Sequence, residues 1–166
     1  MPLWFRDSKP QDIKPRLWLS DAAIAFLTGV IKPSFDVLEH GGGGSTLWFS
    51  GRVKSVRTYE NNPEWATAIT SHNKNNVTVF NGSIENDVET VKPCDLLLID
   101  GEPLKDRETW IYAVPYLVKK RGWVVLDNAN RPDYADARAW IGEIAELKYT
   151  SPLEGSFLVT EFYRIP

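Results

Sequence analysis

A glycine-rich segment supplies the first residues that could do chemistry. Residues 37–46 read Val-Leu-Glu-His-Gly-Gly-Gly-Gly-Ser-Thr, and glycines let a backbone approach a ligand closely and turn sharply into a helix. No Gly-Lys-Ser/Thr ending follows, which argues against a phosphate-binding loop. Glu39 would repel a pyrophosphate but could pair with a cationic amino-acid group. The segment is therefore expected to bind a ligand that carries such a group, with a plain tight turn as the alternative.

A second acidic residue, Glu60, stands 21 residues after Glu39, at the end of the next expected strand. A carboxylate in that position can accept hydrogen bonds from both hydroxyls of a ribose. Proteins that bind NAD and proteins that bind S-adenosylmethionine share this spacing, so it indicates a nucleoside without saying which one. A solvated acid is the alternative interpretation.

Two aspartates and an asparagine follow the next buried strands. Asp100 comes after the apolar run 95–99, and Asp127 and Asn128 come after residues 123–126. If these strands are neighbours, the two carboxylates lie close together, where they could take a proton from a hydroxyl or an amine. With Asn128 they form an all-oxygen set that suits Mg²⁺ or Ca²⁺. Hydrogen bonding within the loop and helix capping compete with that interpretation, and we expect no metal.

Few other residues are candidates for chemistry. His40 lies within the glycine-rich segment, where contact with the ligand or packing is preferred to a role as general base. His72 is expected on the surface at a helix end. Arg107 and Arg131 follow the two acidic turns, where they could hold an anionic substrate or pair with neighbouring acids. The single cysteine, Cys94, is expected to be buried and inert.

Alternating strands and helices would position these residues. Strands are expected at residues 35–38, 53–59, 77–80, 95–99 and 123–126. Helices are expected at residues 22–31, from 46, from 63, at 84–91, at 106–120 with a kink at Pro115, and at 134–145. Residues 147–150 and 157–165 are expected to pair as an antiparallel hairpin. Trp18 and Trp65 fall in helical stretches, where packing in the core is their expected role.

This alternation predicts an α/β fold, a Rossmann-like three-layer αβα sandwich with a mostly parallel sheet that ends in the hairpin. Ligands bind such sheets at the carboxyl ends of the strands. Five expected strands end there in a polar or glycine-containing turn, which predicts a site at one edge of the sheet. The turns are Glu39-His40-Gly41, Glu60-Asn61, Asn81-Gly82, Asp100-Gly101 and Asp127-Asn128.

Length and composition bound the remaining possibilities. The 166 residues are 43% hydrophobic and 25% charged, which fits a single globular domain. An N-terminal arm and helix, residues 1–34, would precede the main part of this domain, residues 35–166, and Trp4 would pack against it rather than cover a ligand.

The net charge of −3 and the scattered basic residues argue against nucleic acid as a partner, and Lys119-Lys120-Arg121 is explained as a helix end. Without a signal peptide or a long apolar run, we expect a cytoplasmic protein that does not enter a membrane.

Taken in order, these segments resemble the class I S-adenosylmethionine-dependent methyltransferases. The resemblance covers about residues 35–165, nearly the whole chain outside the arm. It implies a seven-stranded sheet whose last strand is antiparallel, a methyltransferase activity, and S-adenosylmethionine as the cofactor. It rests on Glu39-x-Gly41-x-Gly43 with Ser45-Thr46-Leu47-Trp48, on Tyr59-Glu60-x-x-Pro63-Glu64-Trp65, and on residues 95–101 and 122–128.

The resemblance also implies roles for individual residues. The glycine-rich segment would line the methionine part of the cofactor, Glu60 would bind the ribose with Asn61 beside it, and residues 81–83 would face the adenine. His40 and Gly42 replace more usual residues, and Asn81 stands where an acid is common. The implied catalytic residues are Asp100, Asp127 and Asn128. The implied cofactor-binding residues are Glu39, His40, Gly41, Gly43, Ser45, Thr46, Glu60, Asn61, Asn81, Gly82, Ser83 and Asp100.

Two competing functions stay open at this point. An NAD-dependent oxidoreductase could use a similar sheet, although the sequence holds no separate substrate domain. A non-catalytic domain could bind the cofactor without transferring its methyl group. For the methyltransferase itself, the expected acceptor is a small molecule with an oxygen or a nitrogen nucleophile, and the sequence is compatible with a homodimer.

Overall fold

The computed structural model describes residues 9–85 and 87–166, which alternate between strands and helices as expected; Trp4 lies outside the described residues. The strands are β1 (Asp36–His40), β2 (Ser55–Glu60), β3 (Val77–Asn81), β4 (Cys94–Ile99), β5 (Val118–Leu126), β6 (Glu146–Pro152) and β7 (Val159–Arg164). The α-helices are α1 (Asp21–Val30), α2 (Gly44–Ser50), α3 (Pro63–Ser71), α4 (Asp106–Tyr112), α5 (Val114–Leu117) and α6 (Ala135–Ile144). Two short 3-10 helices are η2 (Pro10–Asp12) and η3 (Pro132–Tyr134).

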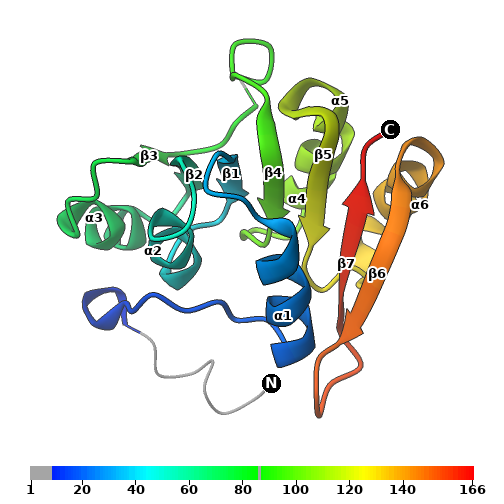
Figure 1. Cartoon of the computed structure of the whole chain (residues 1–166), viewed down its shortest axis with the longest axis horizontal. Coiled ribbons are helices and arrows are strands. Elements are labelled where there is room, and N and C mark those ends of the chain that lie inside the picture. The colour runs from blue at the N-terminus through cyan, green and yellow to red at the C-terminus, as the bar shows by residue number, and fades with distance from the viewer. Residues whose placement is uncertain (1–8, 86) are drawn as a thin grey trace.

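The strands form one seven-stranded sheet in the order β3-β2-β1-β4-β5-β7-β6. Strands β1 to β5 pair in parallel, and β7 is antiparallel to both of its neighbours, β5 and β6. The mostly parallel sheet with a closing antiparallel hairpin is therefore confirmed (Figure 1).

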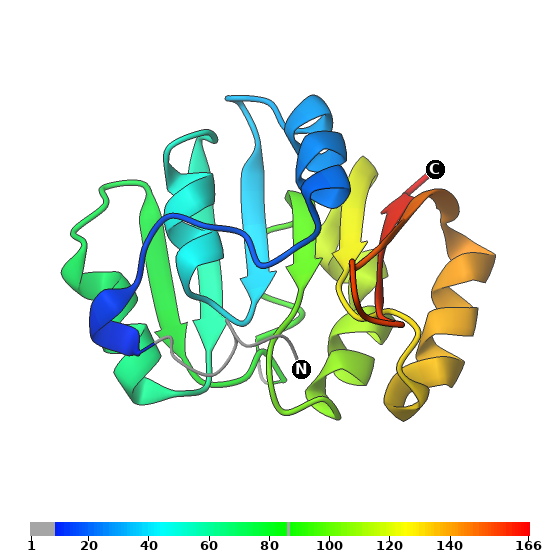
Figure 2. The same cartoon turned by 90° about the horizontal axis from the view of Figure 1, so that it is seen from below.

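Helices cover both faces of the sheet, with α1 and α2 on one face and α4 and α6 on the other (Figure 2). Strand β4 shows why both faces are apolar: Leu96 and Leu98 belong to the core under α1 and α2, whereas Leu97 and Ile99 belong to the core under α4 and α6. Side chains alternate between the faces of a strand, so the run of apolar residues marks a strand buried on both sides.

Strand register places the predicted turns at one edge. His40 pairs with Tyr59 on one side and with Ile99 on the other, and Ile99 pairs with Leu126. The residues that follow these positions therefore come out side by side at the carboxyl end of the sheet. At the opposite end, Cys94 is buried and free, and burial raises the pKa of its thiol to about 12.

The helix expected at residues 106–120 with a kink at Pro115 is confirmed as far as Leu117 and is wrong over residues 118–120. Helix α4 ends at Tyr112, and α5 begins at Val114 because Pro115 interrupts the helical hydrogen bonding. From Val118 the chain is already strand β5, in which Val118 is buried and pairs with Cys94. The cluster at residues 119–121 is thus not a helix end. Instead, Lys119 forms ion pairs with Asp95 and Asp36 at the amino edge of the sheet.

Two smaller expectations are also wrong. The described residues of the segment 84–91 form turns and bends, and Asp, Val and Thr among them are weak helix formers. Trp18 lies in the extended segment before α1 rather than in a helix. The second strand begins at Ser55, two residues later than expected.

Among the described residues, no helix has the length and apolar character needed to span a membrane.

Candidate functional site

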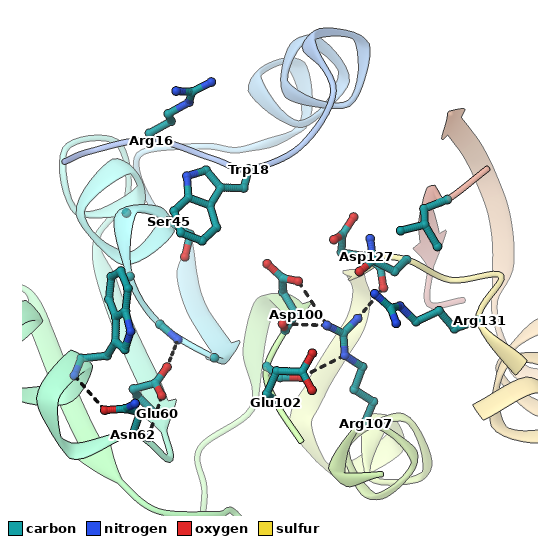
Figure 3. Close-up of a pocket in the computed structure, with 18 of the residues that line it drawn as sticks. Arg16, Trp18, Ser45, Glu60, Asn62, Asp100, Glu102, Arg107, Asp127 and Arg131 are labelled. Atoms are coloured by element: carbon teal, nitrogen blue, oxygen red, sulfur yellow. Dashed lines mark hydrogen bonds and ion pairs between the residues drawn. The ribbon is translucent and has the colours of Figure 1, made fainter. Parts of the chain in front are cut away.

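A pocket of about 470 Å³ opens at the carboxyl edge of the sheet, where the turns after β1, β2, β4 and β5 converge. Its volume falls within the range of small-molecule sites. The arm before α1 and the hairpin between β6 and β7 close it from two further sides (Figure 3). The lining residues are Arg16, Trp18, Gly41 to Ser45, Glu60, Asn62, Trp65, Asp100 to Glu102, Arg107, Asp127, Asn128, Arg131, Leu153 and Leu158.

The glycine loop after β1 is shaped by close backbone contacts. Gly41 has a φ of +84°, and a Cβ there would lie 2.4 Å from the Cα of Gly101 in the loop after β4. A Cβ on Gly44 would lie 2.6 Å from the Lys14 carbonyl oxygen, and the Arg16 N–H donates to the Gly44 carbonyl at 3.0 Å. Glycine is required at these two positions because backbone cannot move aside. The loop is therefore fixed between the β4 turn and the arm.

Glu39 lies directly beneath this loop and is fully buried. Its Oε2 accepts hydrogen bonds from Thr46 at 2.7 Å and from Thr58 at 2.6 Å. Its Oε1 has no hydrogen-bond partner among the described residues. Burial raises the pKa of Glu39 to about 7, against the lowering effect of the Thr58, Thr46 and Ser45 hydroxyls. A buried acceptor without a partner is costly unless a ligand supplies a donor.

Glu60 is held at the rim of the same loop. Its Oε2 accepts from the Gly42 N–H and its Oε1 accepts from the Asn62 N–H, both at 2.8 Å. Asn62 in turn caps α3 through the N–H groups of Glu64 and Trp65. A carboxylate has about four acceptor positions, so these bonds orient Glu60 and leave capacity for a pair of hydroxyls.

Asp100 and Asp127 meet at the other end of the pocket. Their carboxyl groups are close enough to share a hydrogen bond. Asp127 also accepts from the Thr160 hydroxyl at 2.6 Å, whereas the side chain of Asp100 is 34% exposed toward the pocket. Burial and the neighbouring Asp127 carboxylate raise the pKa of Asp100 well above its ordinary value. Burial also raises the pKa of Asp127, so the pair retains a proton to higher pH than an isolated aspartate.

Arg107 holds these two turns together from below. Its guanidinium donates to the carbonyl oxygens of Gly101 at 3.0 Å, Asp127 at 2.6 Å and Asp100 at 2.7 Å, and it forms an ion pair with the Asp100 carboxylate at 3.3 Å. Arg107 is only 2% exposed. Of the two roles left open by the sequence, the structure places this arginine in the salt bridge to a neighbouring acid.

His40 is buried beside the site rather than within the lining. Its ring stacks on Trp110 with centroids 4.9 Å apart, and neither ring nitrogen has a hydrogen-bond partner among the described residues. Burial and the Arg107 charge lower the pKa of His40 to about 3, so the imidazole is neutral. Of the three roles weighed for His40, which are contact with the ligand, packing and general base, packing is the one its contacts match. His72 caps the C-terminal end of α3 on the exposed surface.

The structure brings most of the expected site residues together, but not all of them. Those that line the pocket are Gly41, Gly43, Ser45, Glu60, Asp100, Asp127 and Asn128, and Glu39 and Thr46 lie immediately beneath it. Asn61 instead donates to the Glu102 carbonyl oxygen at 2.9 Å, and Asn81 donates to that of Glu60 at 2.8 Å. The lining also omits Gly82 and Ser83.

Two tryptophans of the lining were expected only as core residues. Trp18 and Trp65 meet edge to face with ring centroids 6.4 Å apart, one from the arm and one from α3. The sequence around Trp18 holds no signal for this placement, because the arm reaches the pocket only through tertiary contacts. For metals, the described residues contain no group of three or more His, Cys, Asp or Glu side chains that could hold an ion.

No protein-family model and no curated protein matches this sequence. Solved structures do resemble it, at low sequence identity. An O-methyltransferase from Bacillus cereus in complex with SAH has a TM-score of 0.70 at 18% identity, over 89% of this chain and 82% of that one. Aeropyrum pernix fibrillarin with natively bound S-adenosyl-L-methionine has a TM-score of 0.69 at 15% identity, over 87% and 74%.

A third neighbour is named for a different reaction. The precorrin 8w decarboxylase of Methanobacterium thermoautotrophicum has a TM-score of 0.67 at 15% identity, over 95% of both chains. Likeness at this level of identity speaks for the fold and not for the reaction. The chain has the fold of the class I S-adenosylmethionine-dependent methyltransferases.

Proposed function

We propose that this protein binds S-adenosylmethionine in the pocket and transfers its methyl group to a small-molecule acceptor. The observation that carries the proposal is the orphaned, buried Oε1 of Glu39 beneath the glycine loop. The amino group of the cofactor's methionine part is a donor and a cation, and either property would stabilise that oxygen. Two of the solved structures that share the fold contain S-adenosylmethionine or its demethylated product, which supports the same choice of ligand.

The other groups of the pocket fit the rest of this cofactor. Glu60, oriented by two backbone N–H groups, would accept the ribose hydroxyls. The glycine loop would let the methionine part approach the backbone of residues 41–43 closely. Trp18 and Trp65 supply apolar surface beside that loop, which would exclude water from the bound ligand.

The two aspartates suit the reacting end of the pocket. S-adenosylmethionine supplies an electrophilic methyl group, which a lone pair of the acceptor takes as the carbon–sulfur bond breaks and S-adenosylhomocysteine leaves. The acceptor's proton needs a base, and the Asp100–Asp127 pair, with raised pKa values, would receive it. Arg107 fixes both turns so that the pair keeps its position. The net charge of −3 supports a small acceptor over a nucleic acid.

Calorimetric titration of the purified protein with S-adenosylmethionine tests the proposal, with NAD as the comparison ligand. We expect micromolar binding of S-adenosylmethionine and no signal from NAD. Glu60→Ala should weaken binding by about tenfold or more, because the ribose loses a charged acceptor. Glu64→Ala removes an exposed acid from the next helix turn and is the matched control, expected to bind as the wild type does.

Folded protein that does not bind S-adenosylmethionine would contradict the proposal. Binding of NAD in its place would favour the oxidoreductase. If binding is confirmed but no acceptor from a small-molecule panel yields S-adenosylhomocysteine, the non-catalytic binding domain becomes the better account.

A further inference from the structure

The pocket holds an arginine whose charge the fold does not use. We propose that the acceptor is an organic anion with an apolar body, its anionic group bound by Arg131 and its body lying against Leu153 and Leu158. This inference rests on the proposed function, because it assigns the end of the pocket beyond the cofactor. It names the chemical class of the acceptor, which the Asp100–Asp127 pair alone does not.

Arg131 reaches the pocket from the connection between β5 and α6. Its backbone N–H donates to the Asn128 carbonyl at 3.1 Å, which ties it to the turn that carries Asp127. Figure 3 shows its guanidinium directed toward Asp127 and the middle of the pocket. The side chain is partly buried and lines the pocket. The cation therefore stands beside the place where the acceptor must present its nucleophile.

The guanidinium of Arg131 lacks partners of the kind that Arg107 and Arg138 have. Its Nε is buried without an acceptor, and within the described ranges 9–85 and 87–166 it makes no ion pair. Arg107, by contrast, bonds to three carbonyl groups and a carboxylate, and Arg138 bonds to Glu161. A partly desolvated cation without a partner is unfavourable, and an anionic ligand would relieve that cost.

The carboxylates closest to Arg131 in the pocket already have partners. Asp127 accepts from Thr160 and lies beside Asp100, and Asp100 pairs with Arg107. Because these acids are engaged with each other and with other groups, we assign the anion for Arg131 to a bound ligand.

An apolar wall stands next to this cation. Leu153 and Leu158 line the pocket from the hairpin between β6 and β7, where the Leu153 N–H donates to the Leu158 carbonyl at 2.9 Å. Asn130, the neighbour of Arg131, fixes this hairpin: its side-chain amide donates to the Phe157 carbonyl at 2.6 Å and accepts from the Val159 N–H at 3.0 Å. The leucines are thus held beside Arg131, which suits a molecule with an anionic group on an apolar body.

The test is binding of matched pairs of small molecules to protein saturated with S-adenosylhomocysteine. Each pair consists of an aryl or alkyl carboxylate, such as 3-(4-hydroxyphenyl)propionate, and its neutral amide. We expect the carboxylates to bind about tenfold more tightly than their amides in calorimetric titration. The preference should fall below about twofold in Arg131→Gln and should survive in part in Arg131→Lys, which keeps a charge but loses the bidentate geometry.

Two controls separate the possible failures. Arg164→Gln removes an arginine at the opposite end of the sheet, where it stacks on Trp123, and should leave the preference unchanged. Affinity for S-adenosylhomocysteine itself should be the same in wild type and Arg131→Gln. Failure of the wild type to bind S-adenosylhomocysteine would instead refute the proposed function.

Four results would overturn the assignment of the acceptor. The first is equal binding of carboxylates and amides, or a preference for amides or amines, by the wild type. The second is a carboxylate preference that persists in Arg131→Gln. The third is a loss of S-adenosylhomocysteine affinity in Arg131→Gln, which would assign the arginine to the cofactor. Absence of measurable binding by every pair at millimolar concentration would count against it in the same way.

Discussion

At the scale of single residues, Glu39 is the group whose charge a cationic ligand would change. Burial raises its pKa to about 7 in the free protein. A cationic amino group at Oε1 would favour the carboxylate and lower that pKa, so binding would release a proton. The affinity for S-adenosylmethionine should therefore increase as the pH rises toward 7 and level off above it, by up to about tenfold per pH unit.

Proton release can be measured directly, by titrating the ligand in two buffers of different protonation enthalpy at pH 6.5. Glu39→Gln keeps the shape of the side chain but cannot lose a proton, so its binding should be weaker and release fewer protons. Equal proton release by the two proteins would show that another group, such as the Asp100–Asp127 pair, responds to the ligand instead.

At the scale of elements, an ion pair joins β7 to α6. It allows a carboxylate of β7 to be buried, which would be costly without the arginine of α6. Glu161 of β7 is 1% exposed and accepts from the guanidinium of Arg138 in α6 and from the Tyr163 hydroxyl. These contacts raise the pKa of Arg138, and burial raises that of Tyr163. The ion pair thereby fixes the last helix against the strand that completes the sheet.

Arg138→Ala should lower the free energy of unfolding by about 2–4 kcal/mol, because it leaves the Glu161 carboxylate buried with one hydrogen bond. Lys148→Ala is the comparison, since it breaks the exposed Lys148–Glu146 pair in the neighbouring strand β6 and should cost less than about 1 kcal/mol. Urea unfolding of the three proteins at pH 7 measures both effects. Similar losses in the two variants would mean that Glu161 finds water or another donor.

At the scale of the whole molecule, the two edges of the sheet respond to pH in opposite directions. At the carboxyl edge, the pKa values of Glu39 and Asp100 are raised, so their contribution to stability is complete at low pH and is lost as the pH rises through those values. At the amino edge, the Ser55 hydroxyl and three lysines lower the pKa of Asp36. Its contribution is complete above its ordinary pKa and is lost in acid. At pH 7 the buried carboxyl groups of Glu39 and Asp100 therefore make the folded protein less stable than uncharged side chains in the same places would.

Glu39→Gln should consequently unfold at a higher urea concentration than the wild type at pH 8. The difference in free energy of unfolding should grow between about pH 4.5 and 7, by up to about 3 kcal/mol, and stay constant above that range. Urea unfolding at pH 4.5, 6 and 8 gives the two curves. A difference that does not change with pH would show that Glu39 titrates normally in the folded protein.

Sequence patterns could predict the positions that depend on strand ends. Gly41, Glu60, Asp100 and Asp127 follow strands that are parallel neighbours, and parallel strands bring their carboxyl ends to one edge whatever the details of packing. The same reasoning could not separate Asn62, which lines the pocket, from its neighbour Asn61, because a shift of one residue in a turn redirects the side chain.

Other parts of the structure depend on contacts between distant segments. Trp18 and Leu158 come from opposite ends of the chain, and no local pattern indicates that they line the same pocket. The boundary between α5 and β5 was misplaced because Leu117 and Val118 form an apolar pair that suits a buried helix or a buried strand. Pairing of Val118 with Cys94 decides between them, and that contact is tertiary.

Strand β7 occupies a place in the sheet that has a consequence for synthesis on the ribosome. It is translated after β6 yet lies between β5 and β6, so β6 has no partner and β5 pairs only with β4 until β7 has left the exit tunnel. A nascent chain of this protein thus exposes two strand edges with unpaired backbone groups for the time that β7 takes to emerge. The hairpin that carries Leu153 and Leu158 forms in the same late step, so this wall of the pocket is among the last parts of the fold to be completed.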